Sequence, residues 1–490
     1  MIDSILSPEK QGFEVAEALS TLPIVVDLDG TLLLSDTLYE AAAVSLFRKP
    51  FALMSALPGL LSGRHVLKAI IANQVDLPSL VWPLREELLN WLRQKAGEGH
   101  TLHLCSAADQ TIVDIVAAKV GIFDSAIGSS QSNLKGLAKA SYLASRFPQG
   151  FIYVGDSNAD LSVWDAADAI VLAGASSGVA AKARKLNKPV IAEFSTAPLG
   201  VKEFLKAIRV HHWTKNVLIF VPLILAHQWS NVSLIVETLL AFICLLAVTS
   251  GTYLLNDIVD LHADRQHWSK RSRAMASGRL SIRSGFVLAV ALIFAGFLAA
   301  GLLQLQFASV LLGYFVVTGA YSLGLKRIPL LDTLVIGLLF TSRVVMGAVL
   351  LEHSRPAWLL TFAVFFFFSL AVAKRHTEIV RASTSGAASL KSRGYEAGDA
   401  PLTLSLGVSA GMASLVVLVI FILMEMLAGN DYARPEFLSA IPVLLSIWLG
   451  RIWILAHRGK MNDDPVSFAI RDYVSIGLGA AIAIVFLVAL

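Results

Sequence analysis

The sequence predicts two domains of different class: an α/β domain over residues 1–197 and an all-α membrane bundle over residues 217–490. The chain has 490 residues, of which 56% are hydrophobic and only 16% are charged, unlike an ordinary soluble protein. The apolar excess begins near residue 205, and the part before it has a normal soluble composition. Each half also carries its own group of aspartates, which suggests two separate sites.

Short β-branched runs alternate with helical patterns in the first domain, as expected of a doubly wound parallel sheet. The run 23–28 is apolar throughout, which is typical of a parallel strand buried on both faces. The expected strands are 23–28, 101–105 and 151–154, and the expected helices are 110–120 and 135–147. Residues 36–100, between the first two strands, read as largely helical and are expected to form a small cap.

Polar side chains follow all three expected strands. The first strand runs into Asp27 and Asp29 (D-x-D-G-T), the second into Ser106, and the third into Asp156 and Asp160 (G-D-S-x-x-D). The carboxyl ends of the strands form the usual catalytic edge of an open α/β sheet. The sequence therefore predicts a site at this edge.

These motifs, in this order, resemble the haloacid dehalogenase phosphatase superfamily over about residues 21–195. The resemblance implies that Asp27 is the nucleophile that forms an aspartyl-phosphate and that Asp29 is the general acid and base. It also implies that Ser106 binds the phosphoryl group and that Lys135 neutralises the nucleophile and the phosphate, with Lys139 as the alternative. The implied Mg²⁺ ligands are Asp27, Asp29, Asp156 and Asp160.

Nine apolar stretches after residue 205 are long enough, or nearly so, to span a membrane. They are 217–229, 233–255, 285–303, 306–325, 330–351, 357–373, 403–427, 438–455 and 473–490. The loops after the even-numbered stretches carry sixteen Lys and Arg residues, against only Arg355 and Arg434 in the opposite loops. By the positive-inside rule the basic loops face the cytoplasm. Nine spans would then leave the first domain in the cytoplasm and Leu490 on the far side of the plasma membrane.

Residues 198–216 join the two domains. This segment mixes Lys and Arg with Phe204, Leu205, Ile208 and Trp213, a pattern that predicts an amphipathic helix at the membrane surface. The polar, acidic start of the chain lacks the pattern of a signal peptide. The net charge of +4 is too small to favour a nucleic-acid partner, and Cys105 and Cys244 fall in different domains, so no disulfide framework is expected.

A second acidic motif follows the stretch 233–255. Asp257, Asp260 and Asp264 are spaced i, i+3 and i+7, with Asn256 beside them, so a helix would place them on one face. Carboxylates in or beside a membrane are unfavourable and are mostly functional. Their hard oxygen ligands suit Mg²⁺ that bridges a diphosphate. The basic residues that follow are suited to hold phosphate oxygens: Lys270, Arg271 and Arg273.

This pattern, N-D-x-x-D-x-x-x-D-R followed by K-R-x-R, resembles the UbiA superfamily of intramembrane prenyltransferases over about residues 200–490. Most of that superfamily has a second Asp-rich motif, but here the loop from Tyr321 reads Y-S-L-G-L-K-R. That loop is similar to decaprenyl-phosphate phosphoribosyltransferases, as are K-R-H-T-E from Lys374 and D-P-V-S-F-A from Asp464. Ala274 departs from the pattern, because relatives usually have proline there.

The second resemblance implies transfer of a 5-phosphoribosyl group from phosphoribosyl diphosphate to the phosphate of a polyprenyl lipid. Mg²⁺ at Asp257, Asp260 and Asp264 would neutralise the diphosphate leaving group, and Tyr321 and Lys326 would bind phosphate oxygens. Because both sites are expected to face the cytoplasm, the first domain is expected to remove the 5-phosphate from the product of the second.

Two other functions are compatible with the sequence. One is a prenyltransferase that acts on an aromatic acceptor and carries an accessory phosphatase; it predicts labelling of that acceptor by a prenyl diphosphate. The other is a non-catalytic, membrane-bound lipid-binding module whose acidic groups only bind ions. It predicts lipid binding without turnover of any diphosphate donor.

Overall fold

A computed structural model of the chain describes residues 19, 21–48, 78, 80–129, 134–195, 199–351, 357–384, 389–390, 393–426, 432–461 and 465–490. The chain forms two compact units. The first combines Met1–Ala207 with Leu254–Leu288, and the second combines Ile208–Tyr253 with Ala289–Leu490. The acidic motif that begins at Asn256 therefore belongs to the same compact unit as the N-terminal domain.

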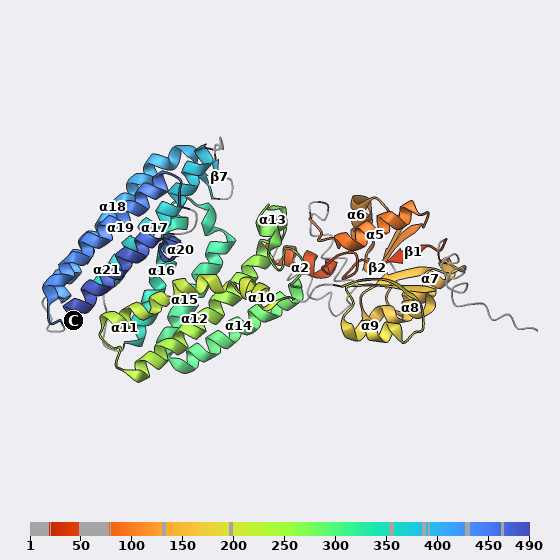
Figure 1. Cartoon of the computed structure of the whole chain (residues 1–490), viewed down its shortest axis with the longest axis horizontal. Helices are drawn as coiled ribbons and strands as arrows, with labels where there is room; N and C mark the ends of the chain where they lie inside the picture. The colour runs from red at the N-terminus through yellow and green to blue at the C-terminus, as the bar shows by residue number, and fades with distance from the viewer. Residues whose placement is uncertain are drawn as a thin grey trace, which may run out of the picture. The chain divides into compact units, whose positions relative to one another are not determined.

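A six-stranded parallel sheet forms the centre of the first unit (Figure 1). Its strands are β1 (Ile24–Val26), β2 (Leu102–Asp109), β3 (Ser125–Ser129), β4 (Ile152–Gly155), β5 (Ala169–Ala173) and β6 (Val190–Phe194). Their order in the sheet is β3-β2-β1-β4-β5-β6. The chain thus winds outward from β1 in one direction and returns to continue from β4 in the other, as in a doubly wound sheet. The predicted α/β class is confirmed, with three more strands than expected.

Helices cover both faces of this sheet (Figure 1). One face packs against α5 (Glu86–Gly97) and α6 (Gln110–Val120), and the other against α7 (Leu137–Arg146), α8 (Leu161–Ala166) and α9 (Ser177–Arg184). Side chains alternate along β1: Ile24 and Val26 enter one core and Val25 enters the other. Because successive side chains of a strand point to opposite faces, a strand covered on both faces is apolar at every position.

The predicted cap over residues 36–100 is described only in part. It begins with α2 (Thr37–Arg48), and residues 49–77 and 79 lie outside the described residues. From Leu80 onward the chain returns to the main core, since Leu80, Leu88 and Leu92 are buried there. Helix α5 is therefore part of the layer that covers the sheet, and the cap itself stays a prediction.

The predicted linker helix over residues 198–216 is divided into two. Helix α10 (Val201–Ala207) ends before Arg209, whose φ of 56° lies in the left-handed region. A 3₁₀ segment, η4 (Val210–Phe220), follows. A side chain at positive φ does not continue a right-handed helix, so the single amphipathic helix was a wrong prediction.

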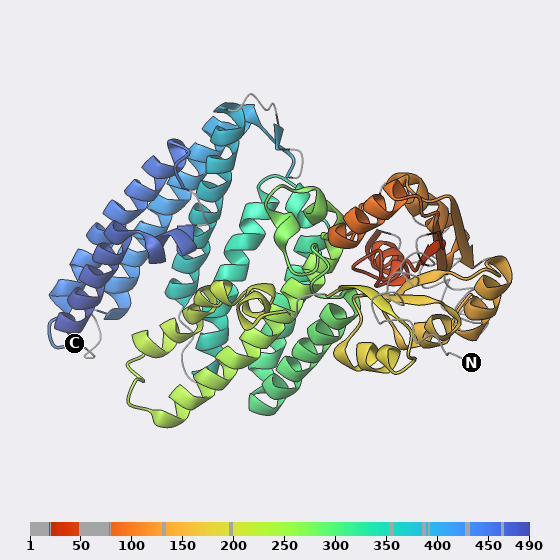
Figure 2. The same cartoon turned by 45° about the vertical axis from the view of Figure 1, so that its right-hand side comes forward.

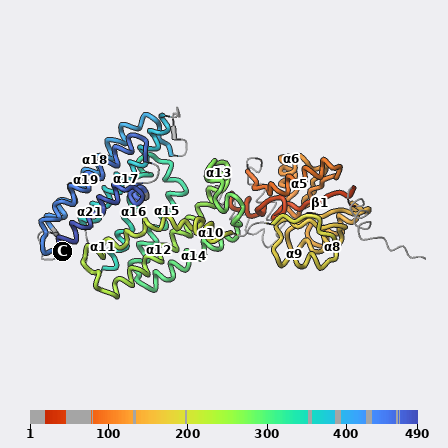
Figure 3. The backbone as a smooth tube through the Cα atoms, in the orientation of Figure 1, coloured from red at the N-terminus to blue at the C-terminus, as the bar shows by residue number. Residues whose placement is uncertain are grey.

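Seven helices among the described residues are long and apolar enough to cross a membrane. They are α12 (Val232–Val259), α14 (Ile282–Leu303), α15 (Leu305–Leu323), α16 (Leu331–Leu350), α17 (Ala357–Thr384), α18 (Ala400–Phe421) and α19 (Ala440–His457). Figures 2 and 3 show α17, α18 and α19 running side by side in the second unit. The membrane class is confirmed.

The count of nine full spans is not confirmed. The first predicted stretch, 217–229, is divided between η4 and the five-residue helix α11 (Val221–Leu225). The last, 473–490, forms α21 (Tyr473–Ala489), which is apolar but shorter than the seven long helices of the described chain.

Candidate active sites

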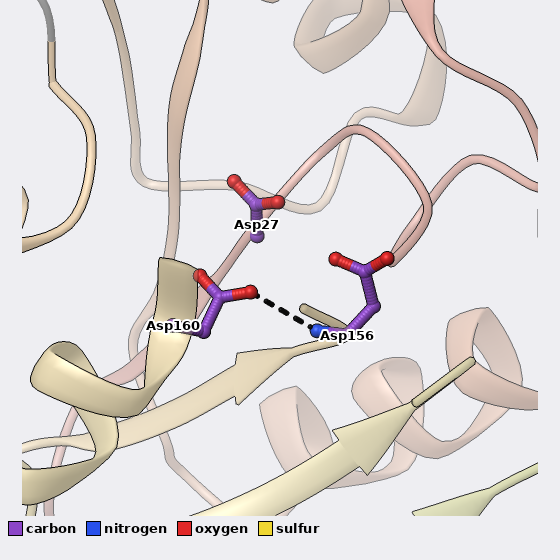
Figure 4. Close-up of side chains that lie close together, drawn as sticks. All are labelled: Asp27, Asp156 and Asp160. Carbon is purple, nitrogen blue, oxygen red and sulfur yellow. Dashed lines mark hydrogen bonds between the residues drawn. The ribbon is translucent and has the colours of Figure 1, made fainter. Parts of the chain in front are cut away.

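Three aspartates meet at the carboxyl ends of two neighbouring strands (Figure 4). Strands β1 and β4 pair with Val26 opposite Val154, so Asp27 and Asp156, which follow these strands, lie at one edge. Asp160 joins them from the short 3₁₀ segment η3 (Asn158–Asp160). One carboxylate oxygen from each lies within 4.8 Å of the other two. The structure therefore brings together three of the four carboxylates expected at a metal site.

The electrostatics of this group require a positive charge nearby. Burial, together with the neighbouring Asp27 and Asp160, raises the pKa of Asp156 to about 8. Burial also raises the pKa of Asp27, although Lys139 opposes the shift. Asp160 accepts hydrogen bonds from the backbone N–H groups of Asp156 and Ser157, at 3.2 and 3.0 Å. Clustered carboxylates of this kind favour a hard cation, so the residues present fit Mg²⁺.

Lys139, not Lys135, is the lysine of this site. Its Nζ donates hydrogen bonds to Oδ1 of Asp27 at 2.7 Å and to the hydroxyl of Tyr153 at 2.9 Å. Lys139 is 3% exposed, whereas Lys135 is exposed to solvent. The expectation for Lys135 is therefore corrected. Helix α7 begins only at Leu137, so Lys139 lies on its buried face and Lys135 precedes it.

Among the described residues, Asp29 does not belong to the group of carboxylates that lie close enough together to hold a metal ion. Its carboxylate accepts hydrogen bonds from the backbone N–H of Thr37 at 2.8 Å and from the Thr37 hydroxyl at 3.2 Å. That Asp29 is a metal ligand stays a prediction, because these two hydrogen bonds hold its oxygens at the start of α2. A position two residues from Asp27, bonded to a neutral hydroxyl, is suited to proton transfer.

Ser106 is buried at the same edge of the sheet. Strand β2 pairs with β1 with Leu104 opposite Val26, which places Ser106 level with the residues that follow β1. Its hydroxyl oxygen accepts a hydrogen bond from the backbone N–H of Ala108 at 3.1 Å. The hydroxyl proton is thereby available as a donor to a bound anion.

Two residues that the motifs did not indicate support this site. The hydroxyl of Tyr153, fully buried on β4, donates to Oδ1 of Asp160 at 2.8 Å and receives a hydrogen bond from Lys139. Arg85 donates from Nε to the carbonyl of Thr31 at 3.0 Å and from Nη2 to the carbonyl of Gly30 at 2.9 Å. Arg85 thus holds the loop that follows Asp27, from more than fifty residues away in the sequence.

Gly30 is required at its position in this loop. Its φ is +78°, a region that side chains rarely adopt. A Cβ there would also lie 2.3 Å from Oδ2 of Asp156. The glycine of D-x-D-G-T therefore lets the loop approach the acidic group closely.

The acidic motif of the membrane half is arranged differently from the prediction. Helix α12 ends at Val259, and Asp260 lies at the break before α13 (Leu261–Gln266). Asp257 and Asp264, both buried, accept hydrogen bonds from the same Nη1 of Arg273, at 3.2 and 2.5 Å. The three aspartates therefore do not share one face of a single helix. Within the described chain they are also not close enough together to hold a metal ion by themselves. The guanidinium of Arg273 supplies the positive charge instead.

Other predicted residues of the motif lie around this pair. Asn256 donates from Nδ2 to Oδ2 of Asp260 at 3.2 Å. The Nζ of Lys270 lies 3.8 Å from Oδ1 of Asp264. Arg271 is exposed. Cationic side chains and carboxylates are thus interleaved in one short stretch of chain.

Tyr321 and Lys326 belong to the second unit, at the end of α15 and in the short segment η6 (Leu325–Arg327). The hydroxyl of Tyr321 accepts a hydrogen bond from Nη1 of Arg393 at 2.6 Å. The nearby Asp332 is fully buried, and both of its oxygens are engaged. Oδ2 lies 2.7 Å from Nη2 of Arg375, and Oδ1 accepts a hydrogen bond of 2.6 Å from the hydroxyl of Tyr395.

Comparison with known proteins places the membrane half in context. Residues 217–475 match the UbiA prenyltransferase family. Uncharacterized protein y4nM of Sinorhizobium fredii is 42% identical to this chain over 470 residues, which make up 96% of this chain and 91% of that protein.

Two further relatives cover less of the chain. Nodulation protein NoeC of Azorhizobium caulinodans is 35% identical over 294 residues, 59% of this chain and 95% of that protein. Decaprenyl-phosphate phosphoribosyltransferase of Mycobacterium tuberculosis is 30% identical over 192 residues, 38% of this chain and 64% of that enzyme.

Proposed function

The chain belongs to the UbiA prenyltransferase family, and on this premise we propose that it transfers a 5-phosphoribosyl group from phosphoribosyl diphosphate to a polyprenyl phosphate. The observation that carries the choice of substrate is the state of Asp332, whose two oxygens are engaged by Arg375 and Tyr395. A fully buried carboxylate whose two oxygens each have a separate partner is poorly placed to bind a metal ion, and the segment before its helix offers Tyr321 and Lys326 instead. Such groups suit direct contact with a phosphate. The likeness to decaprenyl-phosphate phosphoribosyltransferase supports the same choice.

In the proposed transfer, the bond from the anomeric carbon to the diphosphate oxygen breaks and the diphosphate leaves with the electron pair. A new bond forms between that carbon and an oxygen of the lipid phosphate. Among the described residues, Asp257, Asp260 and Asp264 are not gathered closely enough to hold a metal ion by themselves. They would hold Mg²⁺ together with the diphosphate, and the ion would neutralise the charge of that leaving group. Arg273 and Lys270 would bind its phosphate oxygens, because a diphosphate competes with Asp257 and Asp264 for these cations.

We propose a second reaction at the carboxyl edge of the sheet, the hydrolysis of a phosphomonoester. Asp27 attacks phosphorus while Asp29 donates a proton to the leaving alkoxide, and water then releases phosphate from the aspartyl group. Lys139, at 2.7 Å from Asp27, neutralises the nucleophile and the transferred phosphoryl group. Mg²⁺ at Asp27, Asp156 and Asp160 would add the remaining positive charge.

The two reactions fit one sequence of events. The product of the transfer retains the 5-phosphate of the donor, and this phosphomonoester is the proposed substrate of the hydrolysis. The excess of Lys and Arg in alternate loops supports a cytoplasmic location for the acidic motif at the plasma membrane, and the hydrolase site shares a compact unit with that motif. The final product would be a polyprenyl-phosphate-linked ribose without its 5-phosphate.

The experiment that tests this function supplies membranes containing the wild-type protein with either labelled phosphoribosyl diphosphate or labelled prenyl diphosphate. We expect label from phosphoribosyl diphosphate to enter the lipid fraction only when polyprenyl phosphate and Mg²⁺ are present, with the product identified by mass spectrometry. Label that passes from the prenyl donor to an aromatic acceptor would instead identify a prenyltransferase. Lipid binding without turnover of either donor would indicate a non-catalytic module.

The lysine of the hydrolase site can be tested with a matched pair of variants. Lys139→Met is expected to lower the kcat for hydrolysis of a small soluble phosphomonoester by about 10²-fold or more, because it removes the positive charge beside Asp27. Lys135→Met should remain within about twofold of the wild type, since that side chain is exposed. Equal losses in the two variants would contradict the role given to Lys139.

A further inference from the structure

A buried ion pair joins the α/β domain to the acidic motif within the first compact unit. Glu40, on α2, is fully buried. Its Oε1 accepts a hydrogen bond of 2.6 Å from Nη2 of Arg265, and its Oε2 accepts one of 3.0 Å from Nη1. Nε2 of His262 lies 3.6 Å from Oε2 of Glu40. The two partners of the pair are 225 residues apart in the sequence, and Arg265 directly follows Asp264.

The guanidinium of Arg265 also connects two further segments. Its Nη1 donates to the carbonyl of Val81 at 2.9 Å, and its Nε donates to the carbonyl of Ala276 at 3.0 Å. One side chain therefore ties α2, the segment before α5 and the loop after Arg273 to α13. The planar fork of Arg suits such multiple, directional contacts better than a lysine would.

An apolar contact joins the same two stretches of chain as the ion pair. Gly278, with φ of +76°, lies so close to Leu34 that a Cβ on Gly278 would be 2.5 Å from the Leu34 Cβ. Leu34 lies in the loop that follows D-x-D-G-T, and Gly278 follows the K-R-x-R segment. The loop that follows D-x-D-G-T is therefore in contact with the residues that follow K-R-x-R.

Helix α2 links this contact to the hydrolase site. Its first residue, Thr37, is held by both oxygens of Asp29. Glu40, one helical turn later, holds Arg265. One turn of α2 therefore lies between the residue that Asp29 holds and the residue that holds Arg265.

We propose that Glu40 and Arg265, with Val81, Leu34 and Gly278, form a docking contact that fixes the hydrolase domain on the loop of the acidic motif, so that the phosphorylated lipid product passes between the sites without release. The proposal rests on the proposed function for the nature of that product. A buried ion pair is weak evidence for stability, since desolvation offsets the attraction, but it can specify one arrangement of the parts it joins. A fixed arrangement serves a hand-off between two sites better than a flexible tether does.

The docking contact itself can be tested without any activity measurement. Glu40→Gln and Arg265→Gln each leave one buried charge without its partner, and the double variant removes both. In the full-length protein in lipid nanodiscs, we expect amide hydrogen exchange in peptides from 31–45 and 254–288 to rise by about tenfold or more in each single variant. The double variant should exchange more slowly than the worse single variant, because the two substitutions are coupled.

The matched control is the exposed ion pair of Arg184 and Glu193 on the same domain. Arg184→Gln should leave exchange in both regions unchanged, because exposed pairs contribute little. Single variants at Glu40 and Arg265 that exchange like the wild type would overturn the docking contact, whatever the protein catalyses.

The hand-off is tested by the lipid products of the same variants. With phosphoribosyl diphosphate and polyprenyl phosphate supplied, Glu40→Gln is expected to increase the fraction of lipid that retains the 5-phosphate by about fivefold. Hydrolysis of a small soluble phosphomonoester should stay within about twofold of the wild type, since Glu40 does not contact Asp27, Asp156 or Asp160. Increased exchange without an accumulation of the phosphorylated lipid would overturn the hand-off. If the wild type forms no lipid-linked phosphoribose, the proposed function fails, and the exchange experiment still decides the docking contact.

Discussion

Asp257→Asn is expected to abolish the formation of lipid-linked phosphoribose, with a loss of at least about 10³-fold in membranes supplied with donor and polyprenyl phosphate. Asparagine has nearly the same shape but lacks the charge that the proposed Mg²⁺ and Arg273 require. The loss should therefore appear in kcat with little change in the amount of folded protein. Radiolabel transfer from phosphoribosyl diphosphate to the lipid fraction measures it.

A matched control is available on the same helix. Glu237→Gln makes the same acid-to-amide change on α12, twenty residues from Asp257 and thus about 30 Å along the helix. It should leave transfer within about twofold of the wild type. Asp257→Asn should also leave the hydrolysis of a small phosphomonoester intact, because Asp257 does not belong to the group around Asp27. Wild-type transfer by Asp257→Asn would rule out the proposed transferase site.

Asp27→Asn is expected to stop hydrolysis and to trap the product of the transfer. The substitution removes the proposed nucleophile and the ion pair with Lys139 together, so the kcat for a small phosphomonoester should fall by at least about 10³-fold. The full-length variant should instead convert donor and polyprenyl phosphate into a lipid that retains the 5-phosphate, which mass spectrometry distinguishes from the wild-type product by one phosphate group.

The exposed Asp165 on α8 offers a comparison in the same domain. Asp165→Asn should behave as the wild type in both assays. If Asp27→Asn still yields the dephosphorylated lipid, the hydrolase domain does not act on this product. If the variant instead loses hydrolysis of the small substrate and accumulates nothing on the lipid, the two activities are separate.

The arrangement of charges differs between the two sites. Around Asp27 the acids are the more numerous charges, and the raised pKa of Asp156, about 8, reflects both their burial and their mutual repulsion. Around Asp257 the acids are already paired with Arg273 and approached by Lys270. In the proposed reactions the first site would therefore gain a cation, and the second would exchange a protein cation for its ligand.

Local patterns in the sequence were sufficient for the class of each domain and for the shared edge at which Asp27 and Asp156 lie. The β-branched run at residues 23–28 predicted a buried strand because a strand covered on both faces is apolar at every position. The aspartates after that strand and after 151–154 were expected to meet because parallel strands share one carboxyl edge. Membrane helices were expected from length and hydropathy alone. These inferences depend on neighbours within a few residues, which the sequence displays directly.

Only the tertiary structure decided between Lys135 and Lys139, because the start of α7 determines which lysine lies on its buried face. It alone placed Arg273 between Asp257 and Asp264, and Arg85 on the loop after Asp27. It alone brought Glu40 to Arg265. The physical reason is common to all of these contacts. Each joins residues from different elements or across a break between helices, and its geometry depends on how those elements pack, which no local pattern records.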